Sequence, residues 1–126
     1  MKRWREASMP GLRIKTQRVA DGVAYIKAVG FLDAHTFVQM EEEIVKLFNM
    51  RIYKLAVDLS GLEYISSAGA GVFISNVGEA TANGGNIVFI KPSEPVREVF
   101  DLLGLTQIFQ IFETKEEALA IFKKGG

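Results

Sequence analysis

Two adjacent serines followed by Ala-Gly-Ala-Gly are the residues of this chain whose types and spacing could do chemistry. They occupy positions 66 to 71, where an apolar run gives way to a helical pattern. A serine beside a general base can act as a nucleophile, and glycines that open a helix can hold a phosphate against backbone N–H groups. Alternatively, one serine caps the helix, or another enzyme modifies a free hydroxyl. The neighbouring sequence separates these four uses.

A dinucleotide-binding site requires the pattern Gly-x-Gly-x-x-Gly at a turn from strand to helix. Gly69 and Gly71 supply two of these glycines, but Ile74 occupies the third position. The segment 60–66, which leads into the helix, also reads as a loop longer than the tight turn of that fold. Both observations argue against a dinucleotide cofactor.

A serine nucleophile requires a general base, and His35 is the only histidine. Asp33 or Asp58 would have to orient it, and the elbow Gly-x-Ser-x-Gly is absent around both serines. The chain has no cysteine, which removes thiolate catalysis and cysteine-based zinc sites. We therefore expect no catalytic residue, no cofactor and no metal site, and we expect His35 to be a surface residue.

Capping and modification remain for the serine pair. A helix start needs one capping hydroxyl, so if Ser66 caps the helix, Ser67 enters the first turn with its hydroxyl facing outward. A phosphate there would meet free backbone N–H groups and the positive end of the helix dipole. The protein would therefore stay folded. The new charge of about −2 would instead disrupt the binding of a partner that lies over the helix. The residues therefore leave open both a structural cap and a phosphorylation switch.

The chain around the serines reads as alternating strands and helices. Residues 12–17 and 23–30 have strand character, and the Asp21-Gly22 pair between them is typical of a hairpin. The runs 54–59 and 86–91 are almost wholly apolar, as in central parallel strands. The helix 66–83 between them completes a βαβ unit with a right-handed crossover.

Three further helices are expected around this sheet. Asp33 is placed to cap the first, over 33–50, whose acidic run 41–43 is expected to be a solvated face. Ser93 is placed to cap the next. The last begins with the capping box Thr114-x-x-Glu117, after a short strand over 107–112. The fold class is therefore α/β, with about four helices flanking a mostly parallel sheet.

Length and composition fit one domain. The 126 residues are 48% hydrophobic, and fifteen basic residues balance fifteen acidic ones, so neither nucleic acid nor membrane is favoured as a partner. Residues 1–10 are expected to be a flexible tail and residues 11–124 the domain. With no targeting signal, a cytoplasmic protein is the default, as a monomer or weak dimer.

Three stretches together resemble one family, in the expected order and spacing. They are VGFLDAHTF, LAVDLSGLEYISSAGAGVF and GGNIVFIKPSEPVREVFDLLGLTQIFQIFETKEEAL. The chain is similar to a STAS domain of the bacterial anti-sigma-factor antagonists from about Leu12 to Phe122. The resemblance implies a mixed sheet with an antiparallel N-terminal hairpin and then parallel βαβ units, and no catalytic activity.

The resemblance also implies partners and site residues. In such antagonists the unphosphorylated domain binds an anti-sigma factor, usually a serine kinase of the histidine-kinase-like ATPase fold, and frees the sigma factor. The kinase phosphorylates a serine, and a PP2C-like phosphatase reverses the reaction. Matching the family's Asp-Ser-Ser-Gly-Leu-Gly to Ser-Ser-Ala-Gly-Ala-Gly places the acceptor on Ser67, with Ser66 as second choice. The resemblance implies a partner surface made of Asp33, His35, Ser66, Ala68, Gly69, Ala70 and Gly71.

The chain departs from that pattern at three positions. Ser66 replaces the usual aspartate, Ala68 a hydroxyl residue and Ala70 the usual leucine. These changes keep the acceptor hydroxyl but remove a nearby negative charge. They leave open a STAS adaptor without a switch, held in a larger signalling or transport-associated complex. Gly69 and Gly71 also leave open an anion-binding module at the helix N-terminus.

Overall fold

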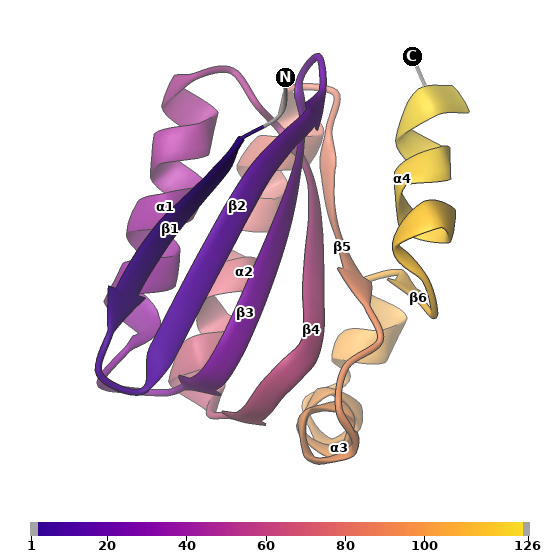
Figure 1. Ribbon diagram of the computed structural model, residues 1–126. Helices are drawn as coiled ribbons and strands as arrows, with labels where there is room; N and C mark the ends of the chain where they lie inside the picture. Colours follow the sequence, from indigo (N-terminus) through magenta and orange to yellow (C-terminus); the bar gives the residue numbers. More distant parts are fainter. Residues whose placement is uncertain (1–2, 125–126) are drawn as a thin grey trace.

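Six strands form one sheet in the order β1-β2-β3-β4-β5-β6 (Figure 1). The computed structural model describes residues 3–124. The strands are β1 (Trp4–Met9), β2 (Leu12–Ala20), β3 (Val23–Leu32), β4 (Lys54–Ile65), β5 (Asn86–Ile90) and β6 (Ile111–Phe112). The helices are α1 (Phe37–Asn49), α2 (Ser67–Ala82), α3 (Glu94–Leu102) and α4 (Lys115–Lys124), with a short 3-10 helix η1 (Leu105–Gln107).

The N-terminal half of the sheet is antiparallel. β2 and β3 pair around the predicted turn, where Gly22 has a φ of 72°, a conformation that glycine adopts without steric cost. The expectation of a flexible tail over residues 1–10 is wrong for residues 4–9, because β1 pairs with β2 from Trp4↔Gln17 to Met9↔Leu12. Residues 1–2 lie outside the described part of the chain.

The second half of the sheet is parallel, as expected. β3 pairs with β4, β4 with β5 and β5 with β6 in parallel. The predicted loop over 60–66 is wrong, because β4 continues to Ile65 beside β3. Only Ser66 then separates β4 from α2, and the feature that departs from a dinucleotide site is the missing third glycine at Ile74.

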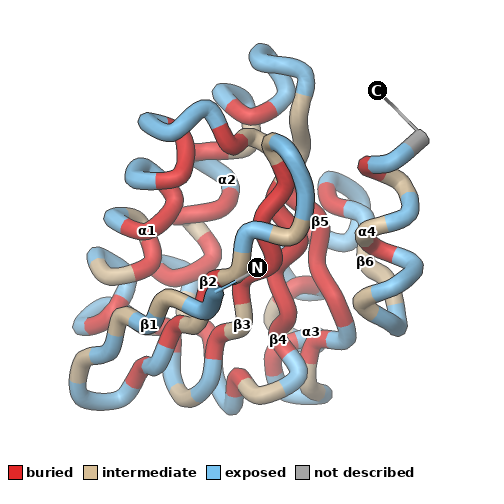
Figure 2. The backbone as a smooth tube through the Cα atoms, turned by 45° about the horizontal axis from the view of Figure 1, so that its top comes forward, coloured by how far each residue is buried: buried red, intermediate tan, exposed pale blue. Residues whose placement is uncertain are grey.

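The two faces of the sheet carry different helices. Ala24, Ile26 and Ala28 face the larger core, to which α1, α2 and α3 contribute. Val23 and Tyr25 point to the opposite face, where α4 supplies Ala118 and Phe122. Figure 2 shows burial concentrated in the central strands and on the inner sides of α1 and α2.

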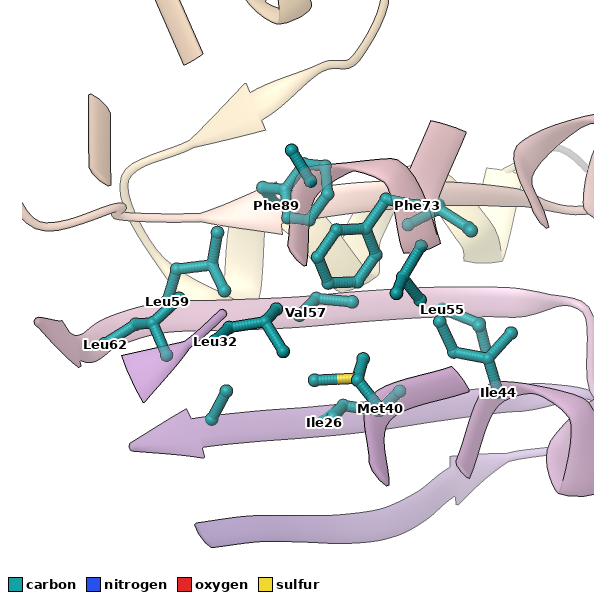
Figure 3. Close-up of a cluster of buried hydrophobic side chains, with 14 of the residues drawn as sticks. Ile26, Leu32, Met40, Ile44, Leu55, Val57, Leu59, Leu62, Phe73 and Phe89 are labelled. Carbon is teal, nitrogen blue, oxygen red and sulfur yellow. The ribbon is translucent and has the colours of Figure 1, made fainter. Parts of the chain in front are cut away.

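The larger core fixes α1 and α2 against the sheet. Met40 and Ile44 of α1 lie over the strands beside Phe73 of α2 (Figure 3). The Phe73 and Phe89 rings meet edge to face, with centroids 4.9 Å apart, a favoured aromatic geometry. The position of the α2 N-terminus relative to β3 and β4 is therefore set by buried packing.

The acidic run of α1 is not simply a solvated face. Glu42 is exposed, but Glu43 is buried and forms an ion pair with Arg5 of β1. Glu41 accepts a hydrogen bond of 3.0 Å from the amide of Asn76 on α2. The prediction is wrong for Glu43 because its partner lies in a strand that was expected to be a tail.

No helix between residues 3 and 124 is both long and apolar enough to span a membrane.

Candidate partner-binding site

Ser66 is the N-cap of α2, as expected. Its backbone is extended (φ −95°, ψ 172°), and its Oγ accepts a hydrogen bond of 3.2 Å from the N–H of Gly69. Its carbonyl accepts the first helical bond, from Ala70. The Ser66 N–H donates to the carbonyl of Leu32 at 3.0 Å, which ties the helix start to the end of β3. The hydrogen bonds of Ser66 therefore stabilise the junction between the end of β3 and the start of α2.

Ser67 occupies the first position of α2 and is exposed. The next residue, Ala68, is also exposed, so the first turn opens to solvent on this side. The first turn of α2 contains no acidic side chain. The positive end of the helix dipole is therefore not offset there by a carboxylate of the helix itself.

Gly69 is the point of closest approach between α2 and β3. A Cβ at this position would lie 2.4 Å from the carbonyl oxygen of Leu32, a distance no side chain tolerates. At Gly71, by contrast, an added Cβ would meet nothing within 4 Å. Gly69 and Ala70 are buried, so neither offers the accessible surface expected of them. Sequence reasoning treated both glycines alike, whereas the structure gives them different roles.

The loop between β3 and α1 lies next to this junction. Asp33 does not cap α1; the N-cap is Thr36. The Asp33 carboxylate instead accepts hydrogen bonds from the N–H groups of His35 (2.9 Å) and Thr36 (3.1 Å). These bonds, led by that from His35, lower the pKa of Asp33 below its usual value. Asp33 therefore shapes the loop, and His35 is exposed as predicted.

The loop and the helix start meet because β3 and β4 end side by side. Leu32 pairs with Ile65 in the parallel register, so Asp33 and Ser66 follow at the same edge of the sheet. The structure thus places the loop that begins at Asp33 and the start of α2 next to each other at this edge of the sheet.

Three exposed apolar side chains near this edge were missed by sequence reasoning. Phe31 and Tyr64 face each other in the β3–β4 register and are 43% and 47% exposed. Ile74 is 46% exposed and lies seven residues after Ser67, hence on the same side of α2. Strand alternation was the available signal, since Leu32 points inward and Phe31 must point outward. We call the following set the Ser67 surface: Phe31, Asp33, His35, Tyr64, Ser67, Ala68, Gly71 and Ile74.

The Ser67 surface is suited to contact with another protein. Two cavities in the described part of the chain lie elsewhere, one beside α4 and one beside β6, and neither is lined by a serine of the pair. Residues 3–124 also contain no cluster of His, Cys, Asp and Glu able to hold a metal ion. Exposed aromatic and aliphatic side chains such as Phe31, Tyr64 and Ile74 are typical of protein-binding surfaces.

Comparison with known proteins identifies the family. The family model described as STAS domain matches residues 15–118, and this chain belongs to that family. A Bordetella bronchiseptica protein named "Putative anti-sigma factor antagonist BtrV" is 30% identical over 82% of this chain and 89% of its own length. A Staphylococcus epidermidis anti-sigma-B factor antagonist is 28% identical over 72% of this chain and 84% of its own.

A solved structure agrees with the fold. The anti-sigma factor antagonist SpoIIAA in its unphosphorylated form superposes with a TM-score of 0.78 at 24% identity, covering 87% of this chain and 96% of that one. The mixed sheet with antiparallel N-terminal strands, parallel later strands and four α-helices is therefore a STAS fold, as the resemblance implied.

Proposed function

We propose that this protein is an anti-sigma factor antagonist that acts by binding, not by catalysis, and that phosphorylation of Ser67 controls it. In the unphosphorylated state it binds an anti-sigma factor through the Ser67 surface and releases the sigma factor. The anti-sigma factor is a serine kinase that modifies Ser67, and a phosphatase restores the free hydroxyl. The names of the relatives, among them BtrV and the Staphylococcus antagonist, support the first part of this proposal.

The proposed switch is supported by the different environments of the two serines. Ser66 is held by its cap and by Leu32, whereas Ser67 is exposed on the first turn of α2. A phosphate on Ser67 would lie at the positive end of the helix, where it is electrostatically favoured. The fold would therefore accept the modification, while a partner covering the first turn of α2 would meet a new charge of about −2.

The serine at position 66 is compatible with this role. Aspartate, the residue usual in the family, is also a good N-cap, and serine replaces it in that role with similar preference. The Gly69 N–H bond that holds the helix start is present with Ser66. The replacement therefore preserves the presentation of Ser67 and removes one negative charge beside it. SpoIIAA, a protein of this fold, has been solved in a phosphorylated form.

A binding experiment with a charge-matched control tests this function. The wild-type protein is titrated into the complex of an anti-sigma factor and its sigma factor from the same genome, and release of the sigma factor is measured. We expect Ser67→Glu to weaken binding by about tenfold or more, which corresponds to about 1.4 kcal/mol. Thr81→Glu places the same charge at the exposed far end of α2 and should bind as the wild type does. Equal loss in both variants, or no release of sigma factor, would contradict the proposal.

A further inference from the structure

A cavity lies on the opposite face of the sheet from α2, between α4 and the hairpin that joins β2 to β3. Its volume is about 570 Å³, within the range of roughly 300–1,000 Å³ that small-molecule sites occupy. Its apolar lining comes from both elements: Val19 and Val23 from the hairpin, Leu119 and Phe122 from α4. The helix on this face is α4, which is only ten residues long. The helices α1, α2 and α3 contribute to the core on the other face (Figure 1).

Three lysines line the cavity, and within residues 3–124 none of them forms an ion pair. The ion pairs of this part of the chain all use arginine. The Lys115 ammonium is engaged otherwise, since it lies 4.1 Å from the centroid of the Tyr25 ring. Lys54 and Lys123 have no such partner there. The cavity thus combines apolar walls with two ammonium groups that form no ion pair in residues 3–124.

Lys54 and Lys123 line the same end of the cavity. Lys54 pairs with Val23 in the β3–β4 register, and Val23 packs in the same small core as Phe122, the neighbour of Lys123. Asp21 lines this end too, because Gly22, which follows it, accepts a hydrogen bond from the N–H of Lys54. Two positive charges and one negative leave a single net positive charge. Glu116 lies at the other end, in the first turn of α4 beside Lys115.

We propose that this cavity binds an amphipathic carboxylate, a linear hydrocarbon chain with one carboxylate head. The chain would lie along Val19, Leu119 and Phe122, and the head would contact the ammonium groups of Lys54 and Lys123. The apolar lining requires an apolar body, and the single net charge matches a monoanion better than a phosphate monoester. This site is independent of the Ser67 surface, since it lies where β3 and β4 begin, at Val23 and Lys54, whereas Ser67 follows the end of β4.

Calorimetric titration of the full chain with octanoate, decanoate and dodecanoate, each below its micelle concentration, tests the proposal. Burying a methylene should tighten the dissociation constant about threefold to fourfold per added carbon. Decanol, which has the same body without the charge, should bind about tenfold more weakly than decanoate. Affinity independent of chain length, or equal affinity for decanol, would overturn the assignment.

Variants locate the site on the protein. The double substitution Lys54→Gln and Lys123→Gln should weaken decanoate binding about tenfold. Ala120→Trp changes an exposed lining residue and should abolish binding by filling the cavity. Lys46→Gln removes an exposed lysine of α1 and should leave binding unchanged. Thermal melting confirms that each variant is folded, and a folded Ala120→Trp protein that binds decanoate normally would overturn the proposal.

Discussion

A Cβ atom on Gly69 would lie 2.4 Å from the carbonyl oxygen of Leu32. The same carbonyl accepts the hydrogen bond from the Ser66 N–H at 3.0 Å. The end of β3 thus contacts the first turn of α2 so closely that Gly69 has no room for a side chain. This contact places the Asp33 loop next to the start of α2.

Alanine at the two glycines of the α2 start should have opposite effects. Gly69→Ala forces a methyl group against backbone and should lower the free energy of unfolding by about 1–3 kcal/mol. Gly71→Ala meets nothing within 4 Å and should raise it by about 0.5–1 kcal/mol, because alanine favours helix. Urea denaturation measures both. A stabilised Gly69→Ala protein would show that β3 and α2 are not in this contact.

Substitutions at Ser66 test its capping role and the effect of a negative charge at this position. Ser66→Ala removes the acceptor for the Gly69 N–H and should cost about 1 kcal/mol of stability. Ser66→Asp keeps an acceptor at the helix N-terminus and should be as stable as the wild type. The midpoints of urea unfolding give the comparison. An unchanged midpoint for Ser66→Ala would mean that Ser66 does not cap α2 in solution.

The ion pair between Arg5 and the buried Glu43 should hold β1 against α1. The Glu43 side chain is only 2% exposed, so Glu43→Gln replaces a charge-assisted bond in a buried place and should cost about 1–3 kcal/mol. Glu42→Gln, at the exposed neighbouring position, should change stability by less than about 0.5 kcal/mol. Amide hydrogen exchange provides a second readout. Faster exchange in β1 for Glu43→Gln alone is expected, and equal behaviour of the two variants would contradict the pairing.

The raised pKa of Tyr25 should lower the free energy of unfolding in alkaline solution. Burial, and then the 2.5 Å hydrogen bond that its hydroxyl donates to Asp58, raise the pKa of Tyr25 above its ordinary value of 10.0. Above pH 10 the unfolded chain therefore releases this proton while the folded protein retains it, so stability falls as pH rises. Unfolding free energies measured from pH 8 to higher pH should decline less steeply for Tyr25→Phe. Parallel curves for the two proteins would exclude this contribution.

The sequence predicts the elements that depend on local pattern. The Asp21-Gly22 turn, the apolar strands β4 and β5 and the Ser66 cap all follow from residues close to one another in the chain. Ile26 and Tyr25, which are adjacent in β3, point to opposite faces of the sheet, as the alternation of side chains along a strand requires. That the Asp33 loop and the start of α2 lie at the same edge of the sheet follows from the parallel register of β3 and β4.

The features missed from the sequence depend on distant partners. β1 has no buried side chain and forms because β2 lies alongside it. Glu43 is buried because Arg5, thirty-eight residues away, reaches it. β4 runs past Ser60 because β3 continues beside it to Leu32. Thr36 and not Asp33 occupies the N-cap position of α1, and the Asp33 carboxylate instead accepts hydrogen bonds from the N–H groups of His35 and Thr36.

The central claim is that Ser67, and not Ser66, receives the phosphate. Its most direct test is incubation of the protein with the anti-sigma factor kinase it binds and ATP, followed by intact mass and peptide mapping. We predict a gain of one phosphate located at Ser67, retained in Ser66→Ala and lost in Ser67→Ala. A phosphate on Ser66, or no gain of mass with a kinase that demonstrably binds, would contradict the account.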